Sequence, residues 1–356
     1  MNKDVLSQED HLRSYEKFEK NTNPLFIFGM GRGGTSLTYH VMKFHPQLVK
    51  LPSDTYFFRH FWNLRKKIPP KLALRILLGF TVSYSRDSRV LTDNREERVF
   101  ILKKMVSLIH EGDPAKIFGF LGYIAYARQK ESAADVRWWV ERTNHHMFYY
   151  KTLKSWFPKC KFIFCVRDPR AVITSALGAI STKKGPLSPS FKIKYCQDRS
   201  FTWLHKAERA LALKKKYGAD VLISRYEDFV RDPVSRIANI WEFLGVSEMS
   251  SEEIKNKVDN LGLTYISKTG VNRARGIDAA SVERWKMLLP EEGQQIIEAI
   301  THKAAGDLGY QIKARMPFAG LSYLIKRDQE TYPLYLKRMA ALNKSLAKNL
   351  LYLYTK

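Results

Sequence analysis

The sequence is poor in cysteine, in acidic residues and in long apolar runs. Its three cysteines, Cys160, Cys165 and Cys196, are too few and too irregularly spaced for a disulfide framework or a zinc site, so we expect a reducing, cytoplasmic compartment and no bound metal. No stretch reaches the ~18 apolar residues of a membrane span, and the polar residues 1–22 lack the apolar core of a signal peptide. The most apolar segment, 72–82, is short and contains an arginine, which predicts a buried or cleft-lining helix.

Acidic side chains are outnumbered by basic ones. Sixty Lys and Arg against 35 Asp and Glu leave a formal net charge of +25, which favours anionic ligands, nucleic acid or anionic lipid without choosing among them. With 356 residues, 45% apolar and 13% aromatic, the chain is long enough to bury the core of one large α/β domain.

Apolar runs that suit buried strands alternate with segments of helical spacing. Strands are expected at 24–29, 161–166 and 220–226, helices at 35–44, 144–157, from 169 onward, 233–244 and 281–305, and a loop at 260–280. Asp168 is expected to cap the helix that Pro169 opens. This alternation predicts a three-layer α/β sandwich around a parallel sheet with right-handed crossovers.

We divide the chain into a polar N-terminal segment, 1–22, a domain, 23–312, and a basic helical extension, 313–356. The extension carries an apolar stripe at helical spacing, formed by Tyr335, Met339, Leu342, Leu346, Leu350 and Leu353. Such a stripe predicts a helix that docks on the domain or on a second copy of the chain, with a membrane-surface helix as the alternative.

The segment FGMGRGGTS, residues 28–36, places a glycine-rich turn between a strand and a helix, where backbone N–H groups can cradle an anion. Gly29 and Gly34 have the G-x-x-x-x-G spacing of a nucleotide P-loop, but Thr35 stands where that motif requires lysine. This difference disfavours a P-loop kinase, and Arg32 is the cation of the turn. The alternative is a tight turn with a solvated arginine.

A second candidate anion site lies in VRDPRAVITS, residues 166–175. Arg167 is expected at the carboxyl end of a buried strand, and Ser175 two turns into the helix that follows. Ligands of open α/β sheets bind at the carboxyl ends of strands, and an arginine with a serine supplies a charged and a neutral donor for one phosphate.

These two segments resemble the sulfotransferases that use 3′-phosphoadenosine 5′-phosphosulfate. PLFIFGMGRGGTSL is similar to the family's 5′-phosphosulfate loop, and FIFCVRDPRAVITS to its 3′-phosphate segment. Weaker similarities follow in the family's order in WVERTNHH, ISRYEDFVRDP with FLGV, and ERWKMLLP, so that the resemblance spans about 23–310. It implies a P-loop NTPase-like topology.

The resemblance also implies roles for individual residues. The 5′-phosphosulfate would be wrapped by Gly31, Arg32, Gly33, Gly34, Thr35 and Ser36. Arg167 and Ser175 would hold the 3′-phosphate, Tyr226 would lie near the adenine, and Arg275 with Gly276 would close over the 3′-phosphate. The sequence departs from the family pattern at Arg32, where many members have lysine, and at Arg142, where a lysine followed by Thr-Pro is common; both changes keep the charge and alter the donor geometry.

Sulfuryl transfer needs in-line geometry, cations for the charged oxygens and a base for the acceptor proton, but no metal. Arg32 is the predicted cation for the moving group, with assistance from Arg142. By resemblance to the carbohydrate and tyrosine branch of the family, Asp54 is the predicted base; the alternatives are that it only shapes a turn, or that His145 or His146 is the base.

The predicted function is therefore transfer of a sulfuryl group from 3′-phosphoadenosine 5′-phosphosulfate, with adenosine 3′,5′-bisphosphate as product, to the hydroxyl of a carbohydrate or other small acceptor, or less favourably to nitrogen. Expected cleft-lining aromatics are Tyr56, Phe57, Phe58 and Trp62. The rivals are a P-loop kinase and a nucleic-acid-binding module; dispersed basic residues and the lack of a recognition motif disfavour the latter, so no nucleic acid is expected.

Overall fold

The computed structural model describes residues 8–51, 54–58, 95–128, 135–261, 277 and 279–312. The apolar segment 72–82, most of the expected loop 260–280 and the extension 313–356 lie outside the described residues.

The strands form one parallel sheet. They are β1 (Asn23–Gly29), β2 (Leu48–Lys50), β3 (Trp138–Glu141), β4 (Lys161–Val166) and β5 (Val221–Arg225). Their order is β2-β3-β1-β4-β5, and β3 pairs in parallel with both β1 and β2. Every β1 residue from Leu25 to Phe28 is completely buried, as expected for a central strand of a parallel sheet. The predicted α/β class with a parallel sheet is confirmed.

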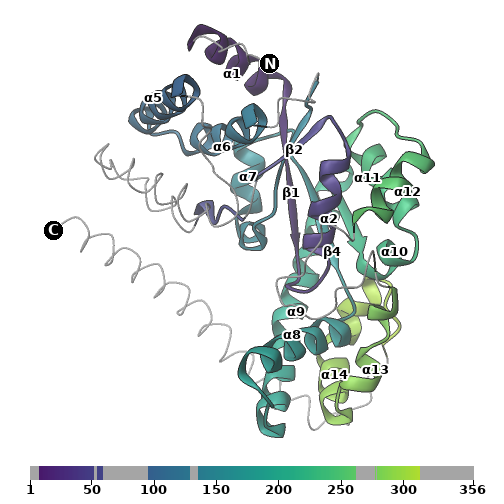
Figure 1. Cartoon of the computed structure of the whole chain (residues 1–356). Helices are drawn as coiled ribbons and strands as arrows, with labels where there is room; N and C mark the ends of the chain where they lie inside the picture. Colours follow the sequence, from purple (N-terminus) through teal and green to yellow (C-terminus); the bar gives the residue numbers. More distant parts are fainter. Residues whose placement is uncertain are drawn as a thin grey trace, which may run out of the picture. The chain divides into compact units, whose positions relative to one another are not determined.

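Helices surround this sheet (Figure 1). The α-helices are α1 (Gln8–Asn21), α2 (Thr35–Val41), α5 (Arg95–Glu111), α6 (Pro114–Arg128), α7 (Tyr150–Trp156), α8 (Pro169–Lys184), α9 (Pro189–Tyr217), α10 (Tyr226–Arg231), α11 (Pro233–Leu244), α12 (Ser251–Asp259), α13 (Trp285–Leu288) and α14 (Glu291–Asp307). Short 3₁₀ helices are η1 (Met42–Phe44), η4 (Asn144–Tyr149), η5 (Gly218–Asp220) and η7 (Ala279–Val282). Among the described residues, no helix has the length and apolar character to cross a membrane.

The described residues fall into two compact units. The first unit contains residues 8–28 and those described between 42 and 162, and the second unit contains residues 29–41 and those described between 163 and 312.

Aromatic packing dominates the first unit. Phe57 stacks on Phe118 with ring centroids 4.3 Å apart, and the edge of Trp139 meets Phe26 at 5.8 Å. Helix α1, inside the segment that the sequence marks only as polar, lies against α5 and α6 (Figure 1). It does so because Tyr15 and Phe18 occupy one helical face and both pack on Tyr123. A polar average composition thus conceals an amphipathic helix.

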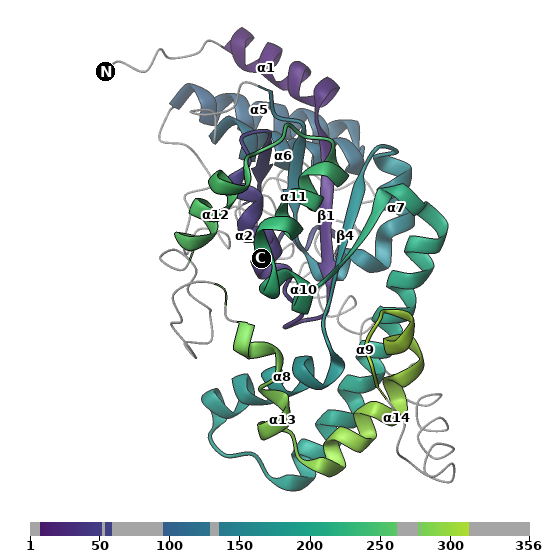
Figure 2. The ribbon, with the colours of Figure 1, turned by 90° about the vertical axis from the view of Figure 1, so that its right-hand side faces the viewer.

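In the second unit, α9 and α14 pack side by side (Figure 2). The buried face of α9 recurs at helical spacing and is formed by Cys196, Ser200, Trp203, Ala207, Ala210 and Leu213. Small residues on this face permit close approach of the partner helix: a Cβ added at Gly293 of α14 would come 3.1 Å from the Cys196 sulfur. The cysteines are free and buried, and burial raises the pKa of the Cys165 thiol to about 12 and that of Cys196 to about 11.

Several local predictions are confirmed. The Asp168 side chain accepts the backbone N–H of Arg170 at 2.8 Å and caps α8, with Pro169 in its first turn. The helical segment expected at 144–157 forms as η4 followed by α7. The last expected strand, 220–226, is two residues too long, because Asp220 ends η5 and Tyr226 begins α10.

Candidate functional site

The glycine-rich turn joins β1 to α2 in the second unit. The Gly33 N–H donates to the Met30 carbonyl at 2.8 Å, which closes the turn. Arg32 and Gly34 both adopt left-handed backbone, with φ of 72° and 96°. An arginine in this region is strained, and such strain persists only where the surrounding structure imposes it, often at ligand sites.

Close packing explains the glycines at two positions of the turn. A Cβ at Gly29 would come 2.6 Å from the Cys165 carbonyl oxygen, and one at Gly34 would come 2.8 Å from Cδ2 of Tyr226. At Gly31, in contrast, a Cβ would meet nothing within 4 Å. The turn is therefore packed against β4 and Tyr226 but open at Gly31, as a cradle for a ligand must be.

Arg167 lies immediately after β4 and is 7% exposed. Its Nη1 donates to the carbonyl of Arg32 at 3.2 Å, and its Nη2 to the carbonyl of Ser281 at 2.8 Å. The guanidinium lies over the Tyr226 ring at 4.1 Å, and the Tyr226 and Ser281 hydroxyls are 2.8 Å apart. Burial lowers the pKa of the Arg167 guanidinium, although neighbouring groups of opposite charge counteract it. Its Nε is buried without a hydrogen-bond partner among the described residues.

The two predicted anion sites meet. Arg32 Nε donates to the Ser175 hydroxyl at 3.0 Å, so a residue of the glycine-rich turn contacts the helix that follows Arg167. Arg32 itself is exposed. Arg32, Arg167, Ser175 and Tyr226, selected from segments far apart in the sequence, thus form one contiguous cluster, which we call the arginine cluster.

Nearby carboxylates serve other partners. Asp168 and Glu298 pair with Arg170, at 2.7 and 2.9 Å. Glu227 accepts the Asp168 backbone N–H at 2.9 Å and the Tyr310 hydroxyl at 2.9 Å, and burial raises the pKa of its carboxyl. In the part of the chain that the structure describes, no carboxylate forms an ion pair with either arginine of the cluster. Among the described residues, the two guanidinium groups contact a hydroxyl, carbonyls and a ring face.

Sequence reasoning missed Lys206 of α9. Its Nζ donates to the carbonyl of Gly29, where the turn begins, at 3.3 Å. Burial lowers the pKa of the Lys206 amine to about 8, with a smaller contribution from Arg199. The sequence held one signal for Lys206. The buried residues of α9 recur at helical spacing, and Lys206 directly precedes one of them, Ala207.

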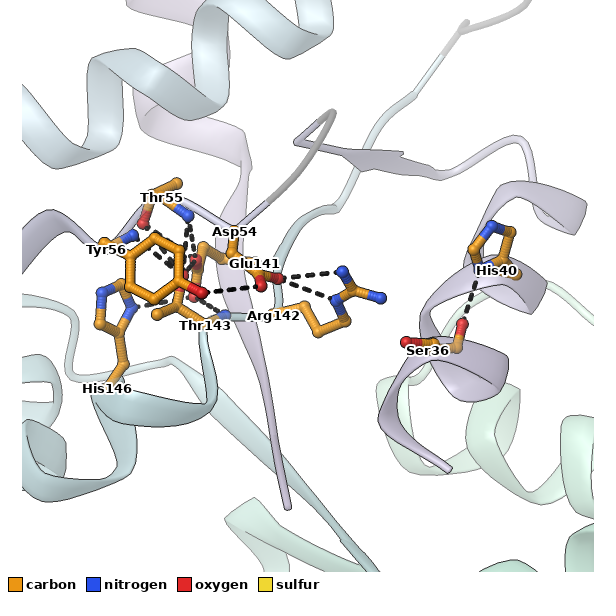
Figure 3. A network of polar contacts seen from close by, with 9 residues as sticks. All are labelled: Ser36, His40, Asp54, Thr55, Tyr56, Glu141, Arg142, Thr143 and His146. Atoms are coloured by element: carbon orange, nitrogen blue, oxygen red, sulfur yellow. Dashed lines mark hydrogen bonds and ion pairs between the residues drawn. The ribbon is translucent and has the colours of Figure 1, made fainter. Parts of the chain in front are cut away.

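In the first unit, Asp54 and Arg142 form an ion pair (Figure 3). Arg142 donates from Nε to Asp54 Oδ1 at 3.0 Å, and its Nη2 lies 3.0 Å from the same oxygen. The Tyr56 hydroxyl donates to Asp54 Oδ2 at 3.5 Å. Tyr56 has a left-handed φ of 46°, the second such residue other than glycine within the described chain. The predicted base and the predicted assisting cation are thus in direct contact.

A buried polar network lies next to this pair (Figure 3). Glu141 is completely buried at the end of β3 and accepts hydrogen bonds from Thr55, Thr143 and His146. Burial by itself raises the pKa of the Glu141 carboxyl, but His146 and the Thr143 hydrogen bonds outweigh it and lower the pKa to about 2. Sequence reasoning missed Glu141 and Thr143.

The other predicted site residues are distributed as follows. His146 is completely buried against Glu141, whereas His145 is half-buried and packs on Phe148 at 5.4 Å. Phe57 and Phe58, at 1% and 2% exposure, belong to the aromatic core, so the expectation that they line a cleft is wrong.

Three predicted residues, Arg275, Gly276 and Trp62, lie outside the described residues. Where the structure describes the chain, no three His, Cys, Asp or Glu side chains are grouped to hold a metal ion.

The chain is similar to known sulfotransferases. A model of the sulfotransferase family matches residues 24–251. Carbohydrate sulfotransferase 3 of Tetronarce californica is 24% identical over 163 residues, which are 43% of this chain and 36% of that protein, so the match spans about a third of that relative's length.

Among solved structures, the sulfotransferase domain of the Synechococcus PCC 7002 olefin synthase superposes with a TM-score of 0.48 at 19% identity, covering 82% of this chain and 97% of that one. Mouse sulfotransferase SULT7A1, complexed with PAP, has a TM-score of 0.46 at 13% identity and covers 83% and 90%.

Proposed function

Because the chain belongs to the sulfotransferase family, we propose that it transfers a sulfuryl group from 3′-phosphoadenosine 5′-phosphosulfate to an acceptor hydroxyl. The observation that carries this proposal is the arginine cluster, in which two guanidinium groups beside a glycine-rich turn have no carboxylate partner among the described residues. Positive charge that no described carboxylate neutralises in an ion pair favours a strongly anionic ligand.

The residues of the second unit fit the donor. The buried Nε of Arg167 has no described partner, and the turn is open at Gly31, so the cluster offers both a donor group and space. In our proposal Arg167 and Ser175 hold the 3′-phosphate, the turn from Gly31 to Ser36 holds the 5′-phosphosulfate, and Tyr226 lies near the adenine. Arg275 and Gly276 keep their proposed role over the 3′-phosphate.

The chemistry assigns distinct tasks to the chain. The donor supplies the sulfuryl group and leaves as adenosine 3′,5′-bisphosphate. Arg32 stabilises negative charge at the turn, because its guanidinium is exposed and bonded only to the Ser175 hydroxyl among described residues. Asp54 accepts the proton of the acceptor hydroxyl, and Arg142 orients that carboxylate through its contact at 3.0 Å. None of these tasks needs a metal ion.

The proposed acceptor is a carbohydrate or another small hydroxylated molecule. Two observations support it: the similarity to carbohydrate sulfotransferase 3 and the aromatic side chain of Tyr56, 41% exposed beside Asp54. Aromatic faces next to a base suit sugar rings. The helical extension 313–356, outside the described residues, remains our proposed element for self-association or membrane contact.

Ligand-induced stabilisation tests whether the chain binds the nucleotide of the proposed sulfuryl donor. Adenosine 3′,5′-bisphosphate without metal, at a hundredfold excess over its dissociation constant, is expected to stabilise the fold by ~2.7 kcal/mol. Thermal shift measurements with the bisphosphate are compared with those using ATP and magnesium. Stabilisation by ATP with magnesium alone would favour a kinase, and unaltered melting with both nucleotides together with DNA binding would favour a nucleic-acid-binding module.

A further inference from the structure

The turn that carries the proposed base is strained, which indicates that neighbouring groups hold the turn in place. Tyr56 adopts a left-handed φ of 46°, a conformation that is strained for a residue with a bulky side chain. Such strain persists only where neighbouring groups impose it. Asp54, two residues earlier, receives the Tyr56 hydroxyl at 3.5 Å, so the strained residue and the proposed base share one turn.

Thr143 and Glu141 accept the hydrogen bonds that hold this turn, and Glu141 Oε1 receives the Thr55 N–H at 3.2 Å. The backbone N–H groups of Thr55 and Tyr56 donate to the Thr143 hydroxyl oxygen, at 2.7 and 3.1 Å. Two consecutive N–H groups are thereby directed at one atom, which fixes the backbone on both sides of Thr55. The Thr143 hydroxyl proton is directed in turn to Oε1 of Glu141.

Glu141 is the common hydrogen-bond acceptor of this buried network. Its Oε1 accepts the Thr55 hydroxyl at 2.9 Å, and its Oε2 accepts the Thr143 N–H at 2.9 Å and Nδ1 of His146 at 2.9 Å. Glu141, Thr55, Thr143 and His146 are each no more than 1% exposed. Removing one member of such a network leaves the other groups buried and unsatisfied, so the members hold one arrangement.

Chain neighbours connect the buried network to the ion pair. Thr55 directly follows Asp54, and Glu141 directly precedes Arg142. Fixing Thr55 against Glu141 therefore fixes the backbone that carries each partner of the pair, and Figure 3 shows the network and the pair next to each other.

We propose that Glu141, acting through Thr143, is a positioning residue that holds Asp54 in its catalytic geometry against Arg142. The inference rests on the proposed function, in which Asp54 is the base. The Glu141 carboxylate is buried and touches no acceptor; it acts through the backbone of the turn. A displacement of ~1 Å at a reacting group lowers turnover by up to about 10²-fold, which is the scale expected when the turn relaxes.

Thr143→Val is the central variant, because it removes the hydroxyl that accepts the Thr55 and Tyr56 N–H groups and donates to Glu141, and it nearly preserves the volume. Turnover is expected to fall by about 10–10²-fold, with the affinity for adenosine 3′,5′-bisphosphate nearly unchanged. Thr143→Ser restores the hydroxyl and is expected to recover most of the turnover. Thr301→Val is the matched control, since it removes a hydroxyl that is equally buried but bonded to a carbonyl within α14.

A double-mutant cycle separates positioning from loss of stability. In an Asp54→Asn background, Thr143→Val is expected to lower turnover little further, because the group it positions is already inactive. An equal fold-loss in both backgrounds would overturn the proposal.

Crystal structures of the wild type and of Thr143→Val supply a readout that needs no activity. We expect Arg142 Nε and Asp54 Oδ1, 3.0 Å apart in the wild type, to move beyond hydrogen-bond distance in the variant. An unchanged contact overturns the positioning role. A wild type that transfers no sulfuryl group to any hydroxyl acceptor overturns the proposed function instead, and the crystallographic comparison still decides the positioning role.

Discussion

The two units hold their site arginines in opposite ways. Arg142 in the first unit is paired with a carboxylate, whereas Arg32 and Arg167 in the second unit contact only neutral groups among the described residues. An arginine whose charge is already balanced serves best to orient its carboxylate partner. An arginine held by hydroxyls and carbonyls keeps its charge for a ligand. The difference fits our proposal that Asp54 of the first unit accepts a proton and that the arginine cluster of the second unit binds an anion.

The largest effect should come from removing the charge of Asp54, the carboxylate that pairs with Arg142. Asp54→Asn keeps the size of the side chain and removes its basicity, so turnover is expected to fall by about 10²–10⁴-fold. Bisphosphate affinity should stay nearly unchanged, because the variant does not alter the arginine cluster. Steady-state kinetics and calorimetric titration measure the two quantities, with the melting temperature as a check on folding.

His145→Ala is the control for Asp54, since His145 is the half-buried rival base and its ring packs on Phe148. A greater loss of turnover at His145, with Asp54→Asn near wild type, would assign the base to the histidine and leave Asp54 as a turn residue.

Removing an arginine of the arginine cluster should lower bisphosphate affinity, which Asp54→Asn leaves nearly unchanged. Arg167→Ala is expected to weaken bisphosphate binding by ~1.5–3 kcal/mol, or about 10–150-fold, as for a charge-assisted contact. Arg236→Ala, at an exposed position on α11, removes the same charge and should leave affinity within experimental error at moderate salt. Equal losses in the two variants, measured by calorimetry, would mean that net charge rather than the cluster binds the anion.

The pH dependence of stability tests the burial of Lys206 in the second unit. The pKa of its amine is lowered by burial from 10.5 to about 8, so between these values the unfolded chain binds more protons than the folded one. Stability should therefore increase as pH rises from 8 towards 10.5, by up to about 3 kcal/mol. Denaturant titrations at several pH values should lose this contribution in Lys206→Met but retain it in Lys215→Met, at an exposed position on the same helix.

Ser175 should give the smallest change. Its hydroxyl accepts from Arg32 Nε at 3.0 Å and is a neutral member of the cluster, so Ser175→Ala is expected to cost ~1 kcal/mol of bisphosphate affinity, about fivefold. Calorimetric titration measures it. A loss as large as that of Arg167→Ala would show that Ser175 positions Arg32 and does more than donate one hydrogen bond.

Local sequence patterns were enough to find the arginine cluster. The glycine-rich turn and the Asp-Pro helix start fix where β1 and β4 end, and parallel strands bring these ends to the same edge of the sheet. Arg32, Arg167 and Ser175 could therefore be selected before any coordinates were known.

Glu141 and Lys206 could not be found in that way. Each depends on contacts between distant segments: Glu141 with Thr55, and Lys206 with the carbonyl of Gly29. A glutamate within a polar motif has no local feature that distinguishes it from a surface residue, and the position of Lys206 next to the buried face of α9 does not identify its partner. The prediction that Phe57 and Phe58 line a cleft failed for the same reason. Their burial depends on packing against a distant residue, Phe118.

The contact between Gly34 and Tyr226 has an evolutionary consequence. A Cβ at position 34 would lie 2.8 Å from the tyrosine ring, and the Arg167 guanidinium lies over the same ring at 4.1 Å. A side chain at position 34 would push the ring against the arginine, so the two positions cannot change independently. Among descendants of this sequence, replacement of Gly34 is expected to survive only with a residue that tolerates its left-handed φ of 96°, such as asparagine, together with a smaller residue at position 226. The pair should therefore covary as a unit despite its separation along the chain.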